Sequence, residues 1–125
     1  MSKIAIVEDD QAIREMYRIK FEAEGHKVVV AENGKRGMEV IEATKPDIIL
    51  LDLMMPEMTG DQMLAEMRKT DWGKDIKVVV LTNVTKEEAS KDLETLKVED
   101  YIIKAFYTPQ QVIDMIEAIL ARKKT

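Results

Sequence analysis

The chain has 125 residues, of which 46% are hydrophobic, so it is long enough to bury the core of one compact domain. It contains no cysteine, which excludes disulfides, thiolate metal sites and cysteine nucleophiles. Its net charge is −5 and its basic residues are scattered, which argues against direct binding to nucleic acid. Neither a signal peptide nor an apolar run of the roughly 20 residues that a membrane span needs is found. We therefore expect a cytoplasmic protein that does not bind membranes.

Five short apolar runs rich in β-branched residues recur along the chain and are predicted to be strands. The runs IILL and VVVL are apolar at every position, which is typical of strands covered by helices on both faces of the sheet. The segments between the runs have helical spacing, so strand and helix are expected to alternate five times. The predicted strands are Lys3–Val7, Lys27–Ala31, Asp47–Leu51, Lys77–Leu81 and Asp100–Ile103.

Capping and helix-breaking residues mark the boundaries of the predicted helices. Thr85–Glu88 and Thr108–Gln111 have the pattern of a capping box at the start of a helix. Gly25 stands where the first helix should end, and Pro46 cannot continue the second. This alternation predicts an α/β fold with a doubly wound parallel sheet and right-handed crossovers. Because no linker or repeat interrupts it, residues 1–125 are expected to form one domain.

Polar side chains directly follow all five predicted strands, but Glu32, after the second strand, offers little. In an open parallel sheet, ligands bind outside the carboxyl ends of the strands. We therefore expect carboxylates, a hydroxyl and an ammonium group to converge at one edge of the sheet. In chain order, they belong to Glu8, Asp9, Asp10, Asp52, Thr82 and Lys104.

Asp52 is the strongest candidate for a reactive residue. It follows four apolar residues, so its carboxylate lies at the rim of the core, where loss of hydration is costly unless the charge is paired. A structural Asp at a strand end would explain it equally well by itself, but the neighbouring acids favour a functional role. These acids would repel one another unless a cation lay between them, and Mg²⁺ prefers such hard oxygen ligands. Asp10 is more simply explained as the N-cap of the first helix.

Lys104 and Thr82 complete a set of side chains suited to phosphoryl transfer. Alone, each has an ordinary structural explanation, as a surface lysine and a back-bonded threonine. Beside Asp52, the ammonium group supplies positive charge and the hydroxyl supplies a donor for an incoming anion. Phosphoryl transfer depends mainly on positioning and charge neutralisation, and the Asp52 carboxylate would be the nucleophile.

The ordered motifs IVEDD, IILLDLMMPEMTG, VVVLT and YIIK resemble those of the receiver domain of bacterial two-component response regulators, from Lys3 to about Leu120. The resemblance implies a flavodoxin-like sheet with strand order 2-1-3-4-5. It also implies that Asp52 accepts a phosphoryl group from a sensor histidine kinase, a histidine phosphotransfer protein or a small acyl phosphate. The chain would then be a signalling switch in a phosphorelay. It would not be an enzyme in the usual sense, since it would catalyse only its own phosphorylation and slow dephosphorylation.

The resemblance assigns the metal ligands. Asp9 matches the direct ligand of Mg²⁺, and Glu8 matches the acid that holds the metal through water. Asp52 and the backbone carbonyl of Met54 would complete the protein ligands.

The resemblance also assigns the switch. Lys104 and Thr82 match residues that contact the phosphoryl group. Thr82 would move toward that group and Tyr101 would swing inward in response. A face formed by the fourth helix, the fifth strand and the fifth helix would then change and be recognised by a downstream protein of unknown identity. No output domain is expected to be attached.

Three features depart from the family pattern. Lys104 is followed by Ala105, where the family usually has a proline after a cis peptide bond. A cis bond before alanine costs about 3–4 kcal/mol, so this loop is either strained or rebuilt in trans. Asn83 is bulkier than the residue usual there and would narrow access to the acceptor. Met54 and Val84 stand where polar side chains would help to orient water, so we predict slow loss of the phosphoryl group.

Other functions stay open at this point. A phosphohydrolase with an aspartyl-phosphate intermediate would need a second acid two residues after the nucleophile, where this chain has Met54. A flavin or nucleotide binder would need a phosphate-binding loop after the first strand, where this chain has three acids. A receiver-like scaffold that acts without phosphorylation is disfavoured because no acceptor residue is missing. Because Asn83 and Ala105 depart from the family pattern, this scaffold function nevertheless stays an alternative.

Overall fold

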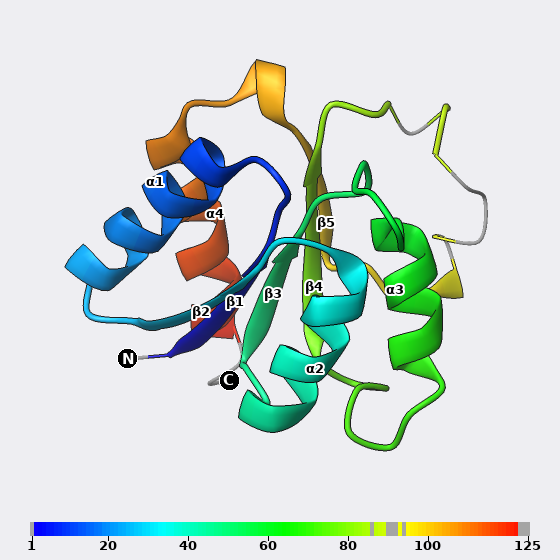
Figure 1. Ribbon diagram of the computed structural model, residues 1–125. Helices are drawn as coiled ribbons and strands as arrows, with labels where there is room; N and C mark the ends of the chain where they lie inside the picture. Colours follow the sequence, from blue (N-terminus) through cyan, green and yellow to red (C-terminus); the bar gives the residue numbers. More distant parts are fainter. Residues whose placement is uncertain (1, 86, 90–92, 94, 123–125) are drawn as a thin grey trace.

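The computed structural model describes residues 2–85, 87–89, 93 and 95–122. Its centre is a parallel sheet of five strands in the order β2-β1-β3-β4-β5 (Figure 1). This confirms the doubly wound sheet and the strand order expected from the resemblance. The strands are β1 (Lys3–Val7), β2 (Lys27–Ala31), β3 (Ile48–Leu51), β4 (Lys77–Thr82) and β5 (Asp100–Ile103).

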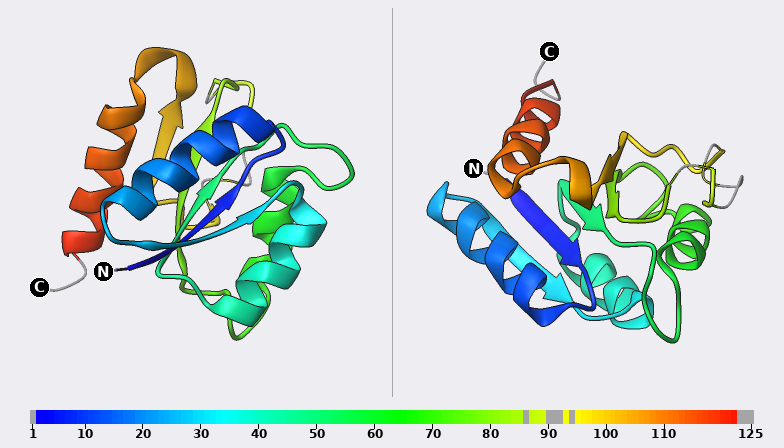
Figure 2. Two further views of the ribbon diagram at one scale, coloured as in Figure 1. Left: turned by 60° about the vertical axis from the view of Figure 1, so that its left-hand side comes forward. Right: turned by 90° about the horizontal axis from the view of Figure 1, so that it is seen from above.

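Helices cover both faces of the sheet: α1 and α4 lie on one face, and α2 and α3 on the other (Figures 1 and 2). A short 3-10 helix, η2 (Lys104–Phe106), follows β5. None of the helices in the described residues has the length and apolar character that a bilayer crossing requires. The α-helices of the described part are α1 (Gln11–Ala23), α2 (Gly34–Thr44), α3 (Gly60–Arg68) and α4 (Pro109–Arg122).

The crossover from β4 to β5 is described at residues 83–85, 87–89, 93 and 95–99. Its predicted capping box forms: Glu88 N–H donates to Thr85 Oγ1 at 3.3 Å, and Thr85 N–H donates to Glu88 Oε1 at 3.1 Å. One turn follows, in which Ala89 N–H donates to the Thr85 carbonyl at 3.0 Å. The predicted helix would continue over residues 90–92 and 94, which lie outside the described residues. In the described part of this crossover, no α-helix continues the turn.

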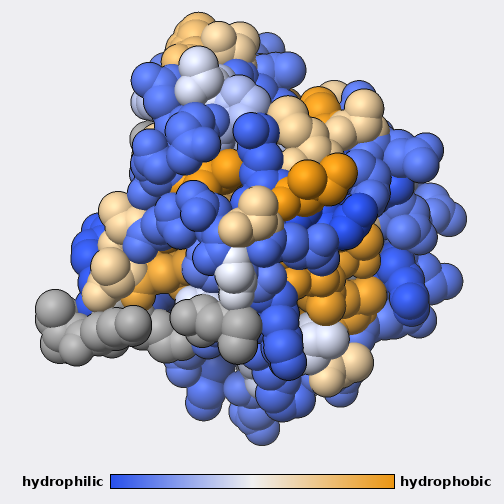
Figure 3. Space-filling view, turned by 90° about the vertical axis from the view of Figure 1, so that its left-hand side faces the viewer, coloured by the Kyte–Doolittle hydropathy of each residue, from blue (hydrophilic) through white to orange (hydrophobic). Residues whose placement is uncertain are grey.

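The sheet separates two apolar clusters because successive strand residues point to opposite faces. In β1, Ile4 and Ile6 belong to the cluster under α1 and α4, whereas Ala5 and Val7 belong to the cluster under α2 and α3. β3 and β4 alternate in the same way, so their uninterrupted apolar runs fill both clusters. Figure 3 views the side on which α1 lies and shows hydrophilic side chains over most of it, with apolar ones between them.

Arg68 ties the end of α3 to two loops at the amino ends of β4 and β5. Its guanidinium donates to the carbonyls of Gly73 and Ile76 at 2.9 and 2.7 Å. It also donates to the carbonyls of Leu96 and Lys97 at 2.8 and 3.0 Å. Burial lowers the pKa of Arg68, but the guanidinium still carries its charge at neutral pH. One side chain thus closes the edge of the fold opposite to the carboxyl ends of the strands.

We expect Arg68→Ala to lower the free energy of unfolding by about 2–4 kcal/mol, because four backbone carbonyls lose a charged donor. Urea unfolding followed by Trp72 fluorescence measures this change. Arg36→Ala is the matched control, since the Arg36 side chain makes an exposed ion pair with Glu39 at 3.2 Å, which is expected to contribute less than about 1 kcal/mol. Equal losses in the two variants would contradict the role assigned to Arg68.

Candidate functional site

The carboxyl ends of the strands lie at one edge of the sheet (Figure 1), and the predicted site residues come together there. Glu8 and Asp52, at the ends of the paired strands β1 and β3, are 4% and 5% exposed, and Thr82, at the end of β4, is fully buried. Asp9 is exposed. Asp10 caps α1 as predicted, since its Oδ1 accepts a hydrogen bond from the N–H of Ile13 at 3.0 Å.

Three carboxylates form an acidic cluster at this edge. Glu8, Asp9 and Asp52 each place one oxygen within 4.8 Å of those of the other two. Glu8 and Asp52 also border apolar side chains of the interior, among them Ile13 and Tyr17. Charges of one sign at this spacing in a poorly hydrated place repel strongly unless a cation neutralises them. The cluster offers only carboxylate oxygens, so its donor set fits Mg²⁺.

Lys104 supplies the positive charge of the site. Its Nζ lies 2.7 Å from Glu8 Oε1 and 3.5 Å from Asp52 Oδ2. Burial lowers the pKa of Lys104, but the hydrogen bond to Glu8 and the charges of Asp52 and Glu8 outweigh that effect, so the net pKa is raised. The ammonium group therefore stays charged at neutral pH and is held between the two buried carboxylates.

Glu8 is the carboxylate whose ionisation is most strongly opposed. Burial raises its pKa to about 7; the hydrogen bond from Lys104 works against this rise, and the charge of Asp52 adds to it. Burial and the Glu8 charge also raise the pKa of Tyr17, to about 12. A cation at the cluster would favour the ionised form of Glu8 and displace its proton.

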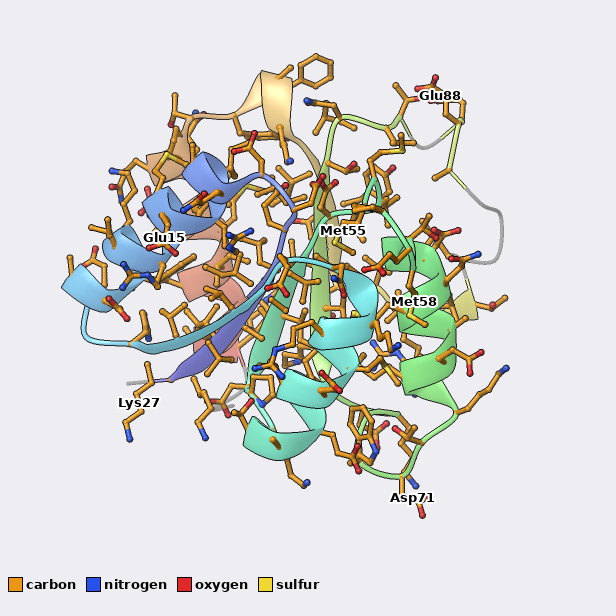
Figure 4. All side chains as sticks on the ribbon, in the orientation of Figure 1. Glu15, Lys27, Met55, Met58, Asp71 and Glu88 are labelled. Atoms are coloured by element: carbon orange, nitrogen blue, oxygen red, sulfur yellow. The ribbon has the colours of Figure 1, made fainter. Side chains whose placement is uncertain are left out.

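The second oxygen of Asp52 is fixed by the loop that follows it. Met54 N–H donates to Asp52 Oδ1 at 3.2 Å, while the Met54 side chain is 65% exposed. The structure thus places Met54 beside Asp52, and the use of its carbonyl as a metal ligand stays a prediction. Farther along this loop, Met55 is buried and Met58 packs against Gly34 at the start of α2 (Figure 4).

Gly60 permits α3 to begin against the backbone of Asp52. A Cβ at Gly60 would collide with the Asp52 carbonyl, and the Gly60 N–H donates to the Leu53 carbonyl at 3.1 Å. Thr59 and Gln62 cap this helix reciprocally. Sequence reasoning missed all of these contacts, although the spacing of Thr59 and Gln62 is a recognisable capping-box signal.

The two expected switch residues are linked through Val84. Its N–H donates to Thr82 Oγ1 at 3.4 Å, and its carbonyl accepts a hydrogen bond from the Tyr101 hydroxyl at 2.5 Å. Burial raises the pKa of Tyr101, and the negative charges of Glu88 and Glu87 raise it further, so the hydroxyl remains a donor. Glu88 lies on the crossover that follows β4 (Figure 4). A displacement of Thr82 would therefore act on the partner of Tyr101.

The loop after β5 is rebuilt in trans, which is one of the two conformations predicted for it. The described part of the chain contains no cis peptide bond, so the Lys104–Ala105 bond is trans. Ala105 lies in η2, and its N–H donates to Asn83 Oδ1 at 3.2 Å. Two of the three departures from the family pattern, Asn83 and Ala105, are therefore in direct contact, which sequence reasoning did not anticipate.

Comparison with known proteins supports the resemblance found in the sequence. The family model described as a response regulator receiver domain matches residues 4–117. The phosphate regulon transcriptional regulatory protein PhoB of Pseudomonas aeruginosa is 35% identical over 121 residues, which cover 95% of this chain and 52% of PhoB. The chain thus spans about half the length of that relative.

Two solved structures are also similar to this chain. One is the receiver domain of the Francisella response regulator 1452, with 25% identity, a TM-score of 0.86 and coverage of 98% of this chain and 99% of that one. The other is response regulator TrrA of Thermotoga maritima in complex with Mg²⁺ and BeF, with 26% identity, a TM-score of 0.78 and coverage of 98% of both chains.

We expect the affinity of the acidic cluster for Mg²⁺ to rise by about tenfold between about pH 6 and about pH 8, because Glu8 must lose the proton that its raised pKa retains. Calorimetric titration at several pH values measures it. Glu8→Gln should bind more weakly and lose this dependence. Asp10→Asn is the control, because it removes a nearby charge, keeps the helix cap and should retain the dependence. A pH-independent affinity in the unmodified chain would contradict the prediction.

Proposed function

The chain belongs to the response regulator receiver family, and we propose that it is a phosphorylation-activated switch of a two-component system. Asp52 accepts the phosphoryl group from a phosphohistidine of a sensor kinase or a phosphotransfer protein. The observation that carries this proposal is the convergence of a buried Asp52 with two further carboxylates and the ammonium group of Lys104. The whole of residues 1–125 serves as one receiver domain, which passes the signal on through a protein partner in the cytoplasm.

The acidic cluster would hold the metal. As the resemblance implies, Asp9 and Asp52 would be direct ligands of Mg²⁺, Glu8 would hold it through water, and the Met54 carbonyl would complete the protein ligands. When bound, the ion neutralises charge on the acceptor and on the phosphoryl oxygens. Glu8 is paired with Lys104 at 2.7 Å, so a Glu8 carboxylate engaged elsewhere would release the Lys104 ammonium group. Lys104 would then be available to the phosphoryl group.

The transfer is a displacement at phosphorus. A carboxylate oxygen of Asp52 attacks, the bond from phosphorus to the donor nitrogen breaks, and its electron pair returns to the imidazole of the donor. Lys104 stabilises the negative charge on the phosphoryl oxygens, as an ammonium group at this distance from the nucleophile can do. The chain catalyses only this reaction and its own slow dephosphorylation.

The phosphoryl group moves the switch through Val84. A dianionic group beside Thr82 is a stronger acceptor for its hydroxyl than the present surroundings. As Thr82 turns toward it, the Val84 N–H loses its acceptor, and the Val84 carbonyl that holds Tyr101 shifts with the same backbone. The crossover after β4, together with β5 and α4, then presents a changed face to a downstream protein.

We expect incubation with acetyl phosphate and Mg²⁺ to add the mass of one phosphoryl group to the intact chain. The gain should require Mg²⁺ and disappear in Asp52→Asn, because the amide is not a nucleophile. Asp61→Asn, the same chemical change in the first turn of α3, should leave the gain intact. Folded chain that binds Mg²⁺ but gains no mass would support the phosphorylation-independent scaffold instead.

The phosphoryl group is expected to persist for minutes or longer, since Met54 and Val84 offer no polar side chain to orient an attacking water. Mass spectrometry after removal of the donor measures its lifetime. Met54→Asn should shorten this lifetime several-fold, because an amide at the exposed position can bind water beside Asp52. Met54→Leu is the apolar control and should leave it unchanged. A lifetime of seconds in the unmodified chain would refute the prediction.

A further inference from the structure

The Asn83 side chain connects the loops that follow β4 and β5, beyond the point where the backbones of the two strands pair. Backbone pairing of these strands ends at Thr82 and Ile103. Beyond that point, Asn83 Oδ1 accepts a hydrogen bond from the N–H of Ala105 at 3.2 Å. This bond continues the connection between the two strands into the loops that follow them.

The hydrogen bond depends on the conformation of the loop after β5. Lys104 opens the 3-10 turn, so its backbone is helical and the N–H of the next residue is not used by the sheet. A proline at position 105 would remove that N–H and would disfavour the helical conformation of Lys104. Ala105 keeps its N–H and allows the helical conformation of Lys104. Asn83 accepts the hydrogen bond that this N–H donates.

The joined residues are the direct neighbours of two site residues. Asn83 follows the buried Thr82, and Ala105 follows Lys104, whose ammonium group reaches Glu8 and Asp52. A lysine side chain has several rotatable bonds, so the placement of its charge depends on how firmly its backbone is held. With the proposed function as its premise, we propose that Asn83 is a positioning residue, which holds the Lys104 backbone and so keeps the ammonium group aimed at the acceptor.

Asn83 could also affect the rate of phosphorylation in the opposite direction, through its size. If its size merely narrowed access to Asp52, a smaller residue would speed phosphorylation. If its acceptor positions Lys104, loss of that acceptor slows phosphorylation whether the replacement is small or large. Asn83→Leu separates the two effects, because leucine keeps the size of asparagine and removes the acceptor.

The experiment compares rates of phosphorylation by acetyl phosphate with Mg²⁺ in the full chain. Asn83→Leu and Asn83→Ala are both expected to slow the reaction about threefold to tenfold, the range that one neutral hydrogen bond spans. Asn83→Asp keeps an acceptor oxygen and should remain closer to the unmodified chain at an ionic strength that screens its charge. An unchanged rate in Asn83→Leu, or a faster one in Asn83→Ala, would overturn the positioning role.

Hydrogen exchange of the Ala105 amide, followed by NMR, reports the hydrogen bond independently of the reaction. It should become several-fold faster in Asn83→Leu and stay slow in Asn83→Asp. A purely structural role would lower the melting temperature of Asn83→Leu without changing its phosphorylation rate, and so would count against the proposal. If the unmodified chain takes up no phosphate, the proposed function itself fails. If it does and Asn83→Leu reacts equally fast, only the positioning role fails.

Discussion

The site depends on two like charges being held together out of water. Glu8 and Asp52 are neighbours because β1 and β3 pair directly, and both are almost fully buried. Such an arrangement is unfavourable unless positive charge lies close by. Lys104 provides it from the end of β5, where η2 begins, on the far side of β4, so only a long side chain can reach across. Lys104 only partly offsets the burial of Glu8, whose pKa stays raised. The cluster therefore favours binding of a cation.

Contacts that anchor the fold are found at both edges of the sheet. At the edge away from the site, Arg68 holds several loop carbonyls with a charged group. At the site, Gly60 lets α3 pack directly on the Asp52 backbone, which fixes the position of Asp52.

The loops around the acceptor are joined by neutral hydrogen bonds. Val84 connects Thr82 to Tyr101, and Asn83 connects to Ala105. Each such bond contributes about 0.5–1.5 kcal/mol. A phosphoryl group brings charge-assisted hydrogen bonds, which are roughly twice as strong as neutral ones. Under the proposed function, the added charge would therefore be strong enough to exchange the contacts of Val84 without unfolding the sheet that carries them.

The sequence by itself determined the strands, most helix boundaries and the set of polar residues at one edge, because strand periodicity, capping and strand ends are local patterns. The ordered motifs then supplied the strand order. Only the tertiary structure decided that Gly60 approaches Asp52, that Asn83 bonds to Ala105 and that Arg68 joins two loops. These contacts join residues from different elements, and no local pattern encodes the distance between them. For the same reason the sequence could give the trans loop after Lys104 only as one of two alternatives, because its contact with Asn83 at the end of β4 is tertiary.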